Sequence, residues 1–179
     1  GGLAIIACIG ILISNLFLEN SIFTNILLGI ISSLVPFLIF NITSYKKLKI
    51  FLGDGGSLFL GFIISLALVY NFGSVHNFTP AFALWCVTIP LFDFLSIVIL
   101  RKLRKHSIIL ADRDHIHHFL ERLGFVKKSI MLIIISAALV MLLIGYIIEI
   151  YFPTLSFPTF IAIFFLYYYM RFYLREEKN

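Results

Sequence analysis

The run "SIMLIIISAALVMLLIGYIIEIY", residues 129–151, decides the fold of this chain. It contains one acidic residue, Glu149, and no basic residue. A helix rises about 1.5 Å per residue, so a run of this length crosses the ~30 Å hydrocarbon core of a bilayer. Lipid cannot bond to backbone N–H and C=O groups, whereas an α-helix satisfies them internally. The run therefore predicts a transmembrane helix.

The rest of the 179 residues repeats this pattern. The composition is 61% hydrophobic and 13% charged, with a mean hydropathy of +1.06. Soluble domains carry about a quarter charged residues, so the chain belongs to the membrane class. The apolar runs are continuous rather than alternating, which excludes a transmembrane β-barrel. We predict an all-α, polytopic helical bundle that forms a single transmembrane domain over residues 1–179, with about six spans: 1–18, 22–42, 57–70, 79–100, 129–151 and 157–170.

The basic residues indicate how this bundle sits in the membrane. All 14 lysines and arginines fall in two internal loops, 43–56 and 101–128, and in the tail that begins at residue 171. By the positive-inside rule this face is cytoplasmic, and both chain ends lie on it. Orientation and contact with anionic lipid headgroups explain most of these charges. Function is therefore sought in polar residues that topology does not require.

The first such residue is Asp54, in "FLGDGGSLFLGF", residues 51–62. It lies between glycines where a basic loop enters the third predicted span. Glycines allow tight turns and close approach of a ligand, and a carboxylate there can coordinate Mg²⁺ together with phosphate oxygens. The alternative is that Asp54 and Ser57 merely cap a helix that begins near Ser57. The glycine cluster lacks the spacing of a Walker A loop.

The second is Asp93, in "TIPLFDFLSIVIL", residues 88–100. It lies about 12 Å along a helix from Arg101, inside the cytoplasmic half of the fourth predicted span, and just after a kink predicted at Pro90. Acids within a membrane usually line a cavity or pair with a partner. A functional role is favoured here over a structural pair with a polar group on a neighbouring helix. One functional alternative is a transporter or ion path through Asp93.

The third is "DRDHIHHFLERLGF", residues 112–125, in the histidine-containing loop 101–128. Asp112 is expected as a helix N-cap and Gly124 as the residue that ends the helix. The segment is then a short amphipathic helix at the membrane surface. Its apolar stripe at helical spacing consists of Ile116, Phe119, Leu120 and Leu123.

The polar side of this predicted helix suits a ligand that carries phosphate. A helical wheel groups His115, His118 and Arg122 on one flank and sets His117 apart. Arginine binds phosphate with two hydrogen bonds, and histidine donates a hydrogen bond or carries a proton. Two alternatives stay open, a zinc site and a solvated surface helix without a ligand.

These three motifs, taken in order, resemble the polyprenyl-phosphate N-acetylhexosamine-1-phosphate transferase superfamily, glycosyltransferase family 4. "FLGDGGSLFLGF" is similar to its Phe-Met-Gly-Asp-x-Gly-Ser motif. "PLFDFLSIVILRKLRK", residues 90–105, followed by "DRDHIHHFLERLGF", resembles the Pro-Leu-x-Asp segment and His-x-His-His loop of the GlcNAc-1-phosphate transferase branch. The phospho-MurNAc-pentapeptide translocase branch is a weaker match. The resemblance covers residues 1–128 in order and spacing.

The resemblance implies an enzyme of cell-envelope polysaccharide synthesis, such as that of lipopolysaccharide or teichoic acid. The enzyme would catalyse the first membrane step of this synthesis. In that step an N-acetylhexosamine 1-phosphate, here expected to be GlcNAc-1-phosphate, is transferred from a UDP-sugar to undecaprenyl phosphate, and UMP is released. The implied cofactor is Mg²⁺, with Mn²⁺ as an alternative. The implied location is the bacterial cytoplasmic membrane, with the active face cytoplasmic. No nucleic-acid partner is expected, and a homodimer stays open.

The resemblance also assigns residues. It implies catalytic roles for His115, His117, His118 and Asp93, and it places the three histidines near the sugar nucleotide. It implies that Asp54 binds the metal. Substrate contacts are expected from Asn41, Lys49 and Arg113, to which the helical wheel adds Arg122.

Two departures from the family pattern bear on the extent of the protein. Family members carry an Asp-Asp motif on an early loop and an Asn-x-x-x-x-x-Asp-Gly-x-Asp-Gly segment in mid-chain, and neither occurs here. "GGLAIIA", residues 1–7, resembles the residues that follow the second segment. We therefore expect the C-terminal half of a larger transferase, with an inactive truncated remnant as the alternative. "KHSIILA", residues 105–111, also lacks the family's Gly and Ser-Pro-Phe.

Overall fold

The computed structural model describes residues 1–15, 22–43, 46–72, 78–103 and 115–176. Within these residues the regular secondary structure is entirely helical, which confirms the predicted fold class. The elements are α1 (Gly2–Asn15), α2 (Ile22–Ile42), a 3₁₀ turn η1 (Lys46–Leu48), α3 (Gly53–Phe72), α4 (Pro80–Cys86), α5 (Thr88–Leu103), α6 (Ile116–Arg122), α7 (Lys127–Tyr151) and α8 (Pro153–Glu176).

Four of these helices, α2, α3, α7 and α8, are long and apolar enough to cross a membrane. The bent pair α4 and α5 makes a fifth span if it is counted as one. The remaining predicted span corresponds to α1, which is apolar but shorter. The prediction of a multi-pass membrane protein is thus confirmed, while the predicted count of six spans is not.

The fourth predicted span is broken rather than kinked at its proline. α4 and α5 meet at an angle of 86°, and the break lies at Val87, which has φ −123° and ψ 25°. Pro90 falls in the first turn of α5, where a missing N–H costs no intrahelical hydrogen bond. The hydroxyl of Thr88 donates to the carbonyl of Trp85 at 2.9 Å and so satisfies an acceptor at the end of α4. The kink predicted at Pro90 is therefore wrong by three residues.

The sixth predicted span, 157–170, begins earlier and ends later in the structure. α8 follows α7 after a single residue, Phe152, because Pro153 has the fixed φ that suits the first position of a helix. At its other end α8 continues through Arg171 to Glu176. Arg171, which was expected in a tail outside the membrane, therefore belongs to a helix of the bundle.

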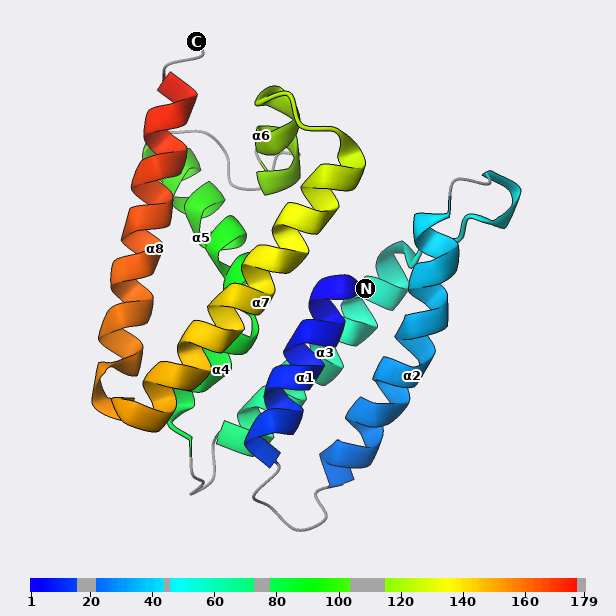
Figure 1. Ribbon diagram of the computed structural model, residues 1–179, viewed down its shortest axis with the longest axis horizontal. Coiled ribbons are helices and arrows are strands. Elements are labelled where there is room, and N and C mark those ends of the chain that lie inside the picture. The colour runs from blue at the N-terminus through cyan, green and yellow to red at the C-terminus, as the bar shows by residue number, and fades with distance from the viewer. Residues whose placement is uncertain (16–21, 44–45, 73–77, 104–114, 177–179) are drawn as a thin grey trace.

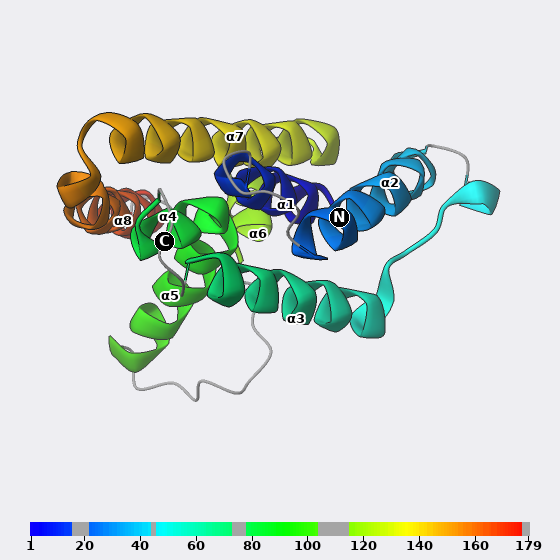
Figure 2. The same ribbon diagram turned by 90° about the horizontal axis from the view of Figure 1, so that it is seen from below.

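The helices pack around α1 and α4. α1 contacts α2, α3, α4 and α7, while α8 packs on α4, α5 and α7 (Figures 1 and 2). Trp85 of α4 is buried at the centre, and its indole N–H donates to the hydroxyl of Ser156 at 3.1 Å. A Cβ at Gly145 would lie 2.3 Å from Trp85, so only glycine lets α7 approach the indole this closely.

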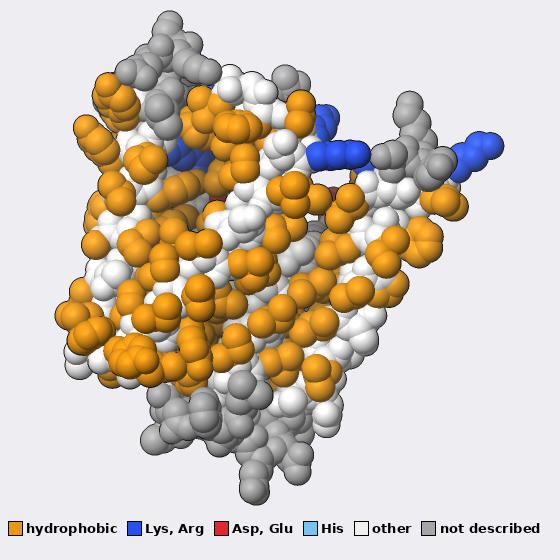
Figure 3. All heavy atoms as spheres, in the orientation of Figure 1, with side chains coloured by type: hydrophobic (Ala, Val, Ile, Leu, Met, Phe, Trp, Pro, Cys, Tyr) orange, Lys and Arg blue, Asp and Glu red, His pale blue; other side chains and the backbone are white. Residues whose placement is uncertain are grey.

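The surface agrees with a membrane location. Hydrophobic side chains cover the face formed by α7, α1 and α2, while lysine and arginine side chains lie toward the end that holds α6 (Figure 3). Large apolar residues such as Leu58 and Val69 are more than 70% exposed, a fraction that suits contact with lipid. The described lysine and arginine side chains of the basic loops thus lie toward one end of the bundle.

Candidate functional site

Helix α6 places the histidines, and its start differs from the prediction. The helix begins at Ile116 with His115 at the N-cap, so the cap predicted at Asp112 is wrong; Asp112 itself lies outside the described residues. His115 forms no side-chain cap. Instead the backbone N–H of Ile116 donates to Oδ1 of Asp93 at 2.9 Å. The α6 N-terminus is therefore satisfied by a carboxylate from α5.

The end of α6 is as predicted. Gly124 has φ 95°, a left-handed conformation that glycine adopts without steric cost. The N–H of Gly124 donates to the carbonyl of Glu121 at 3.0 Å, and that of Phe125 donates to the carbonyl of Leu120 at 3.2 Å. These two bonds form a Schellman motif. The predicted apolar stripe is half-buried, and α6 packs on α7.

Asp93 is the polar centre of the site. Its side chain is 13% exposed. Oδ2 lies 2.9 Å from Nδ1 of His115, and Oδ1 accepts a hydrogen bond from the Arg171 guanidinium at 2.8 Å as well as the one from Ile116. The structural pair that was the less favoured interpretation of Asp93 is thus present. The same carboxylate also contacts the histidine segment.

Arg171 was missed as a site residue. It is 4% exposed, and the same nitrogen that bonds Asp93 lies 2.5 Å from the Ser96 hydroxyl and 2.9 Å from the Tyr167 hydroxyl. Its guanidinium also lies 5.9 Å from the centre of the Tyr167 ring. The signal in the sequence was the i, i+4 spacing of Tyr167 and Arg171, which puts both on one face of a helix.

The three histidine rings form one row, contrary to the helical wheel. The His117 ring centre is 4.1 Å from that of His118 and 5.8 Å from that of His115. The wheel failed because His115 precedes the helix and has an extended backbone, with φ −64° and ψ 153°. His117, which was set apart, therefore lies between the other two.

His118 is oriented by a carboxylate of its own helix. Its Nδ1 lies 3.0 Å from Oε2 of Glu121. An ionised carboxylate can only accept, so Nδ1 carries the hydrogen and Nε2 is left for a ligand. This hydrogen bond is the main reason why the pKa of the Glu121 carboxyl lies below its usual value of 4.5. Partial desolvation, together with the nearby His118 and His115, lowers the pKa of His117 below 6.5 and favours its neutral form.

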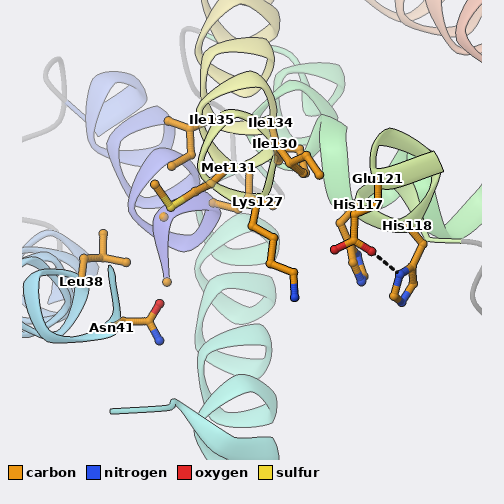
Figure 4. Close-up of a pocket in the computed structure, with 13 residues that line it drawn as sticks. Leu38, Asn41, His117, His118, Glu121, Lys127, Ile130, Met131, Ile134 and Ile135 are labelled. Atoms are coloured by element: carbon orange, nitrogen blue, oxygen red, sulfur yellow. Dashed lines mark hydrogen bonds and ion pairs between the residues drawn. The ribbon is translucent and has the colours of Figure 1, made fainter. Parts of the chain in front are cut away.

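Beside these side chains lies a cavity of about 570 Å³ (Figure 4). The Lys127 side chain extends into the space between Asn41 and the histidines (Figure 4). One wall is polar and the other apolar, an arrangement that suits an amphiphile with a charged group. The polar wall consists of Asn41, His117, His118, Glu121 and Lys127, and the apolar wall includes Leu38, Ile130, Met131, Ile134 and Ile135.

Two further cavities adjoin the first. One of about 550 Å³ lies among α1, α3 and α5, with Val87 at the break before α5, and is mostly apolar; Ser57 is among its lining residues. The other, of about 340 Å³, is lined by Asp93, His115 and His117. Leu3 lines all three cavities, so they surround the first turn of α1.

Only some of the predicted substrate-binding residues lie at these cavities. Asn41 lines the largest one, and its amide donates to the carbonyl of Ile50 at 2.8 Å. Lys49 is exposed, with its ammonium 5.5 Å from the Phe51 ring centre. Arg122 is exposed in the last turn of α6, and neither Lys49 nor Arg122 lines the three cavities. Arg113 lies outside the described residues.

Asp54 is exposed in the first turn of α3, which begins at Gly53 with φ 68°. The helix start predicted near Ser57 is therefore wrong, and Ser57 instead donates to the Asp54 carbonyl at 2.9 Å. Across the described ranges, no three or more His, Cys, Asp or Glu side chains are grouped to hold a metal ion. A lone exposed carboxylate fits Mg²⁺, which takes one or two carboxylates with waters and phosphate oxygens.

Comparison with known proteins identifies the family. Residues 1–71 match the model of glycosyl transferase family 4. The undecaprenyl-phosphate alpha-N-acetylglucosaminyl 1-phosphate transferases of Pasteurella multocida and Haemophilus influenzae are each 36% identical over 146 residues, which cover 79% of this chain and 41% of the relative. The transferase of the same name from Escherichia coli K12 is 33% identical over 123 residues, 68% of this chain and 34% of the relative.

The chain thus spans about two fifths of the length of the first two relatives. No solved structure is significantly similar to it. The motifs that carried the resemblance, from the glycine-flanked Asp54 to the histidine segment, fall within the part of the chain that a match over 79% of its length must include. Residues 1–71 thus match glycosyl transferase family 4, and the named transferases match up to 79% of the chain.

Proposed function

We propose that the chain is part of an enzyme that transfers N-acetylhexosamine 1-phosphate from a UDP-sugar to undecaprenyl phosphate and releases UMP. GlcNAc-1-phosphate is the expected group, because the relatives are named for alpha-N-acetylglucosaminyl 1-phosphate transfer to that lipid. The observation that carries the proposal is the two-walled cavity, with a polar wall from α6, Asn41 and Lys127 and an apolar wall from other side chains of α7 and α2. A lipid phosphate needs the polar wall for its phosphate group and the apolar wall for its hydrocarbon chain.

The chemistry asks little of the protein beyond position and charge. A phosphate oxygen of the lipid forms a bond to the phosphorus that carries the sugar, and the bond from that phosphorus to the UMP oxygen breaks. Such transfers are catalysed mainly by placing the phosphates and neutralising their charge. Lys127 and His118 offer N–H donors in the cavity wall, and Glu121 holds the His118 ring in place.

Asp54 is the residue we assign to Mg²⁺, which when bound would neutralise charge on phosphate oxygens. His115, His117 and Asp93 line the adjoining cavity and belong to the same catalytic face. Lys49, Arg113 and Arg122 are assigned to attraction and binding of the anionic sugar nucleotide. By the positive-inside rule this end faces the cytoplasm of a bacterial inner membrane, with both termini on that side.

The ion-path alternative gains nothing from the described residues. A carboxylate that relays protons or ions must exchange its partners, whereas Asp93 is bonded by a guanidinium, an imidazole and a backbone N–H. The alternative of an inactive remnant makes a different prediction, since it expects no transfer at all. The assay below distinguishes it.

The test is transfer by the full-length protein purified in detergent. With undecaprenyl phosphate, Mg²⁺ and UDP-GlcNAc labelled in the sugar, label should move into the lipid phase while UMP is released in equal amount. Asp54→Asn should reduce this rate by about a thousandfold or more, because the variant loses a charge that acts on the transferred phosphate. Wild-type protein without transfer activity would refute the proposal.

A matched control separates the metal role from damage to the fold. Gly29→Ala changes an exposed glycine of α2, where an added Cβ meets no atom within 4 Å. It should keep the wild-type rate. Full activity of Asp54→Asn alongside an active Gly29→Ala would remove the metal role from Asp54 while leaving the transferase assignment intact.

A further inference from the structure

The pair of Arg171 and Asp93 joins three helices at the cavity. The two residues are 78 positions apart, and neither the sequence motifs nor the proposed chemistry assigns Arg171 a task. Arg171 comes from α8, Asp93 from α5, and the backbone that Asp93 caps belongs to α6. The contact therefore connects the last helix of the chain to the histidine helix.

The burial of Arg171 calls for an explanation. A guanidinium that is 4% exposed in a membrane bundle is costly unless it is paired. Here it has one carboxylate and two hydroxyls within hydrogen-bond distance, from Asp93, Ser96 and Tyr167. The Ser96 hydroxyl in turn donates to the Asp93 carbonyl at 2.9 Å. Both Arg171 and Asp93 are thus held in one arrangement.

The two oxygens of Asp93 have different tasks. Oδ1 accepts from Arg171 and from the backbone N–H of Ile116, whereas Oδ2 contacts His115. Arg171 therefore fixes the rotation of the carboxylate, and this rotation aims one oxygen at the start of α6 and the other at His115. Without Arg171 the carboxylate is free to turn, and both contacts loosen together.

α6 depends on this cap more than a long helix would. It spans Ile116–Arg122, and the side chain of its N-cap residue, His115, makes no capping hydrogen bond to the helix. Short helices are marginal without tertiary anchors. The anchors of α6 are the Asp93 cap and its packing on α7. Any movement of its first turn carries the His117 and His118 rings with it.

We propose that Arg171 is a positioning residue of the transferase: through Asp93 it fixes the start of α6 and so places the histidine row in the wall of the cavity. The effect on activity rests on the proposed function. The effect on α6 does not, and can be measured without substrate.

The test substitutes Arg171→Gln in the full-length protein and uses two readouts. Hydrogen–deuterium exchange should become faster at the amides of residues 116–122 and stay unchanged in α1 and α3. In the transfer assay kcat should fall about 100-fold, as expected for misplaced catalytic groups. KM for UDP-GlcNAc should stay within about threefold, because the substrate contacts themselves remain.

Two further variants keep the result interpretable. Arg171→Lys retains the charge without the planar fork, so both readouts should lie between those of the wild type and of Arg171→Gln. Lys128→Gln removes an exposed charge at the same end and should leave both unchanged. If Arg171→Gln does not accumulate in the membrane, Tyr167→Phe removes one hydrogen-bond acceptor of Arg171 and should loosen α6 in the same direction.

The outcomes separate the two proposals. Wild-type exchange in α6 of Arg171→Gln would overturn the positioning role, and so would equal loosening of α1, α3 and α6, which indicates a general loss of stability. A wild-type protein without transfer activity whose α6 still loosens in Arg171→Gln would refute the proposed function alone. If Asp93→Asn and Arg171→Gln act through one contact, the double variant is no slower than Asp93→Asn.

Discussion

Asp93 and Asp54 are two carboxylates with similar sequence surroundings, but they differ in burial and in hydrogen-bond partners. Both precede an apolar run, and both belong to motifs that resemble those of the family. In the structure Asp93 is 13% exposed and is bonded by Arg171, His115 and the Ile116 amide. Asp54 is exposed, and within the described part of the chain no side chain or amide bonds its carboxylate.

The difference shows how one residue type serves two purposes. A carboxylate surrounded by donors has its charge already balanced and acts on the position of its partners. A carboxylate held at a helix start by the backbone alone keeps its oxygens available for a cation or for water. Asp93 therefore belongs to the frame of the site, and Asp54 to the part that meets the ligand.

The largest expected effect on stability comes from Asp93→Ala. Truncation leaves the Arg171 guanidinium buried without its carboxylate, which should lower the free energy of unfolding by about 3–5 kcal/mol. Asp54→Ala should cost less than about 1 kcal/mol, the usual size of an acid's interaction with the helix dipole in a first turn. Denaturant unfolding in detergent measures both. If both variants lost the same free energy of unfolding, Asp93 could not be distinguished from Asp54 as a structural residue of the site.

A medium effect is expected from Gly53→Ala, which tests whether the backbone alone holds Asp54. Gly53 has φ 68°, a conformation that costs an L-residue roughly 1–2 kcal/mol, although an added Cβ would meet no atom within 4 Å. Gly55→Ala is the matched control, since its Cβ is equally free and its helical backbone gains up to about 1 kcal/mol from alanine. The two changes should therefore shift the unfolding midpoint in opposite directions. Destabilisation of similar size by both would show that side-chain space, not φ, matters at this turn.

The membrane character and most helix positions could be predicted from the sequence, because long apolar runs leave no other stable backbone in lipid. The gathering of basic loops at one end followed from counting charges. Asn41 and the histidines were assigned to one site by resemblance, and the structure places Asn41, His117 and His118 around one cavity and His115 at the adjoining one.

What could not be predicted depends on contacts between distant residues. The start of α6 is set by Asp93, 23 positions earlier, so no local capping signal exists to be found. Arg171 was assigned to a tail because a hydropathy run ends at the first charge, although a paired charge can continue inside the bundle. The 86° break at Val87 was missed because a proline three residues later offered a simpler local cause.

The smallest expected effect concerns Glu121, a third carboxylate that lies between the other two in burial and has one partner, His118. Its pKa is lowered, so its contribution to stability is present above pH 4.5 and is lost as the pH falls through the lowered value. Its charge also raises the pKa of His117 against the desolvation that lowers it. Glu121→Gln should therefore move the His117 midpoint further down, as seen by NMR titration of the imidazole Cε1–H signals. Asp54→Asn should leave that midpoint unchanged, and an equally unchanged midpoint in Glu121→Gln would show that its carboxylate does not act on the histidine row.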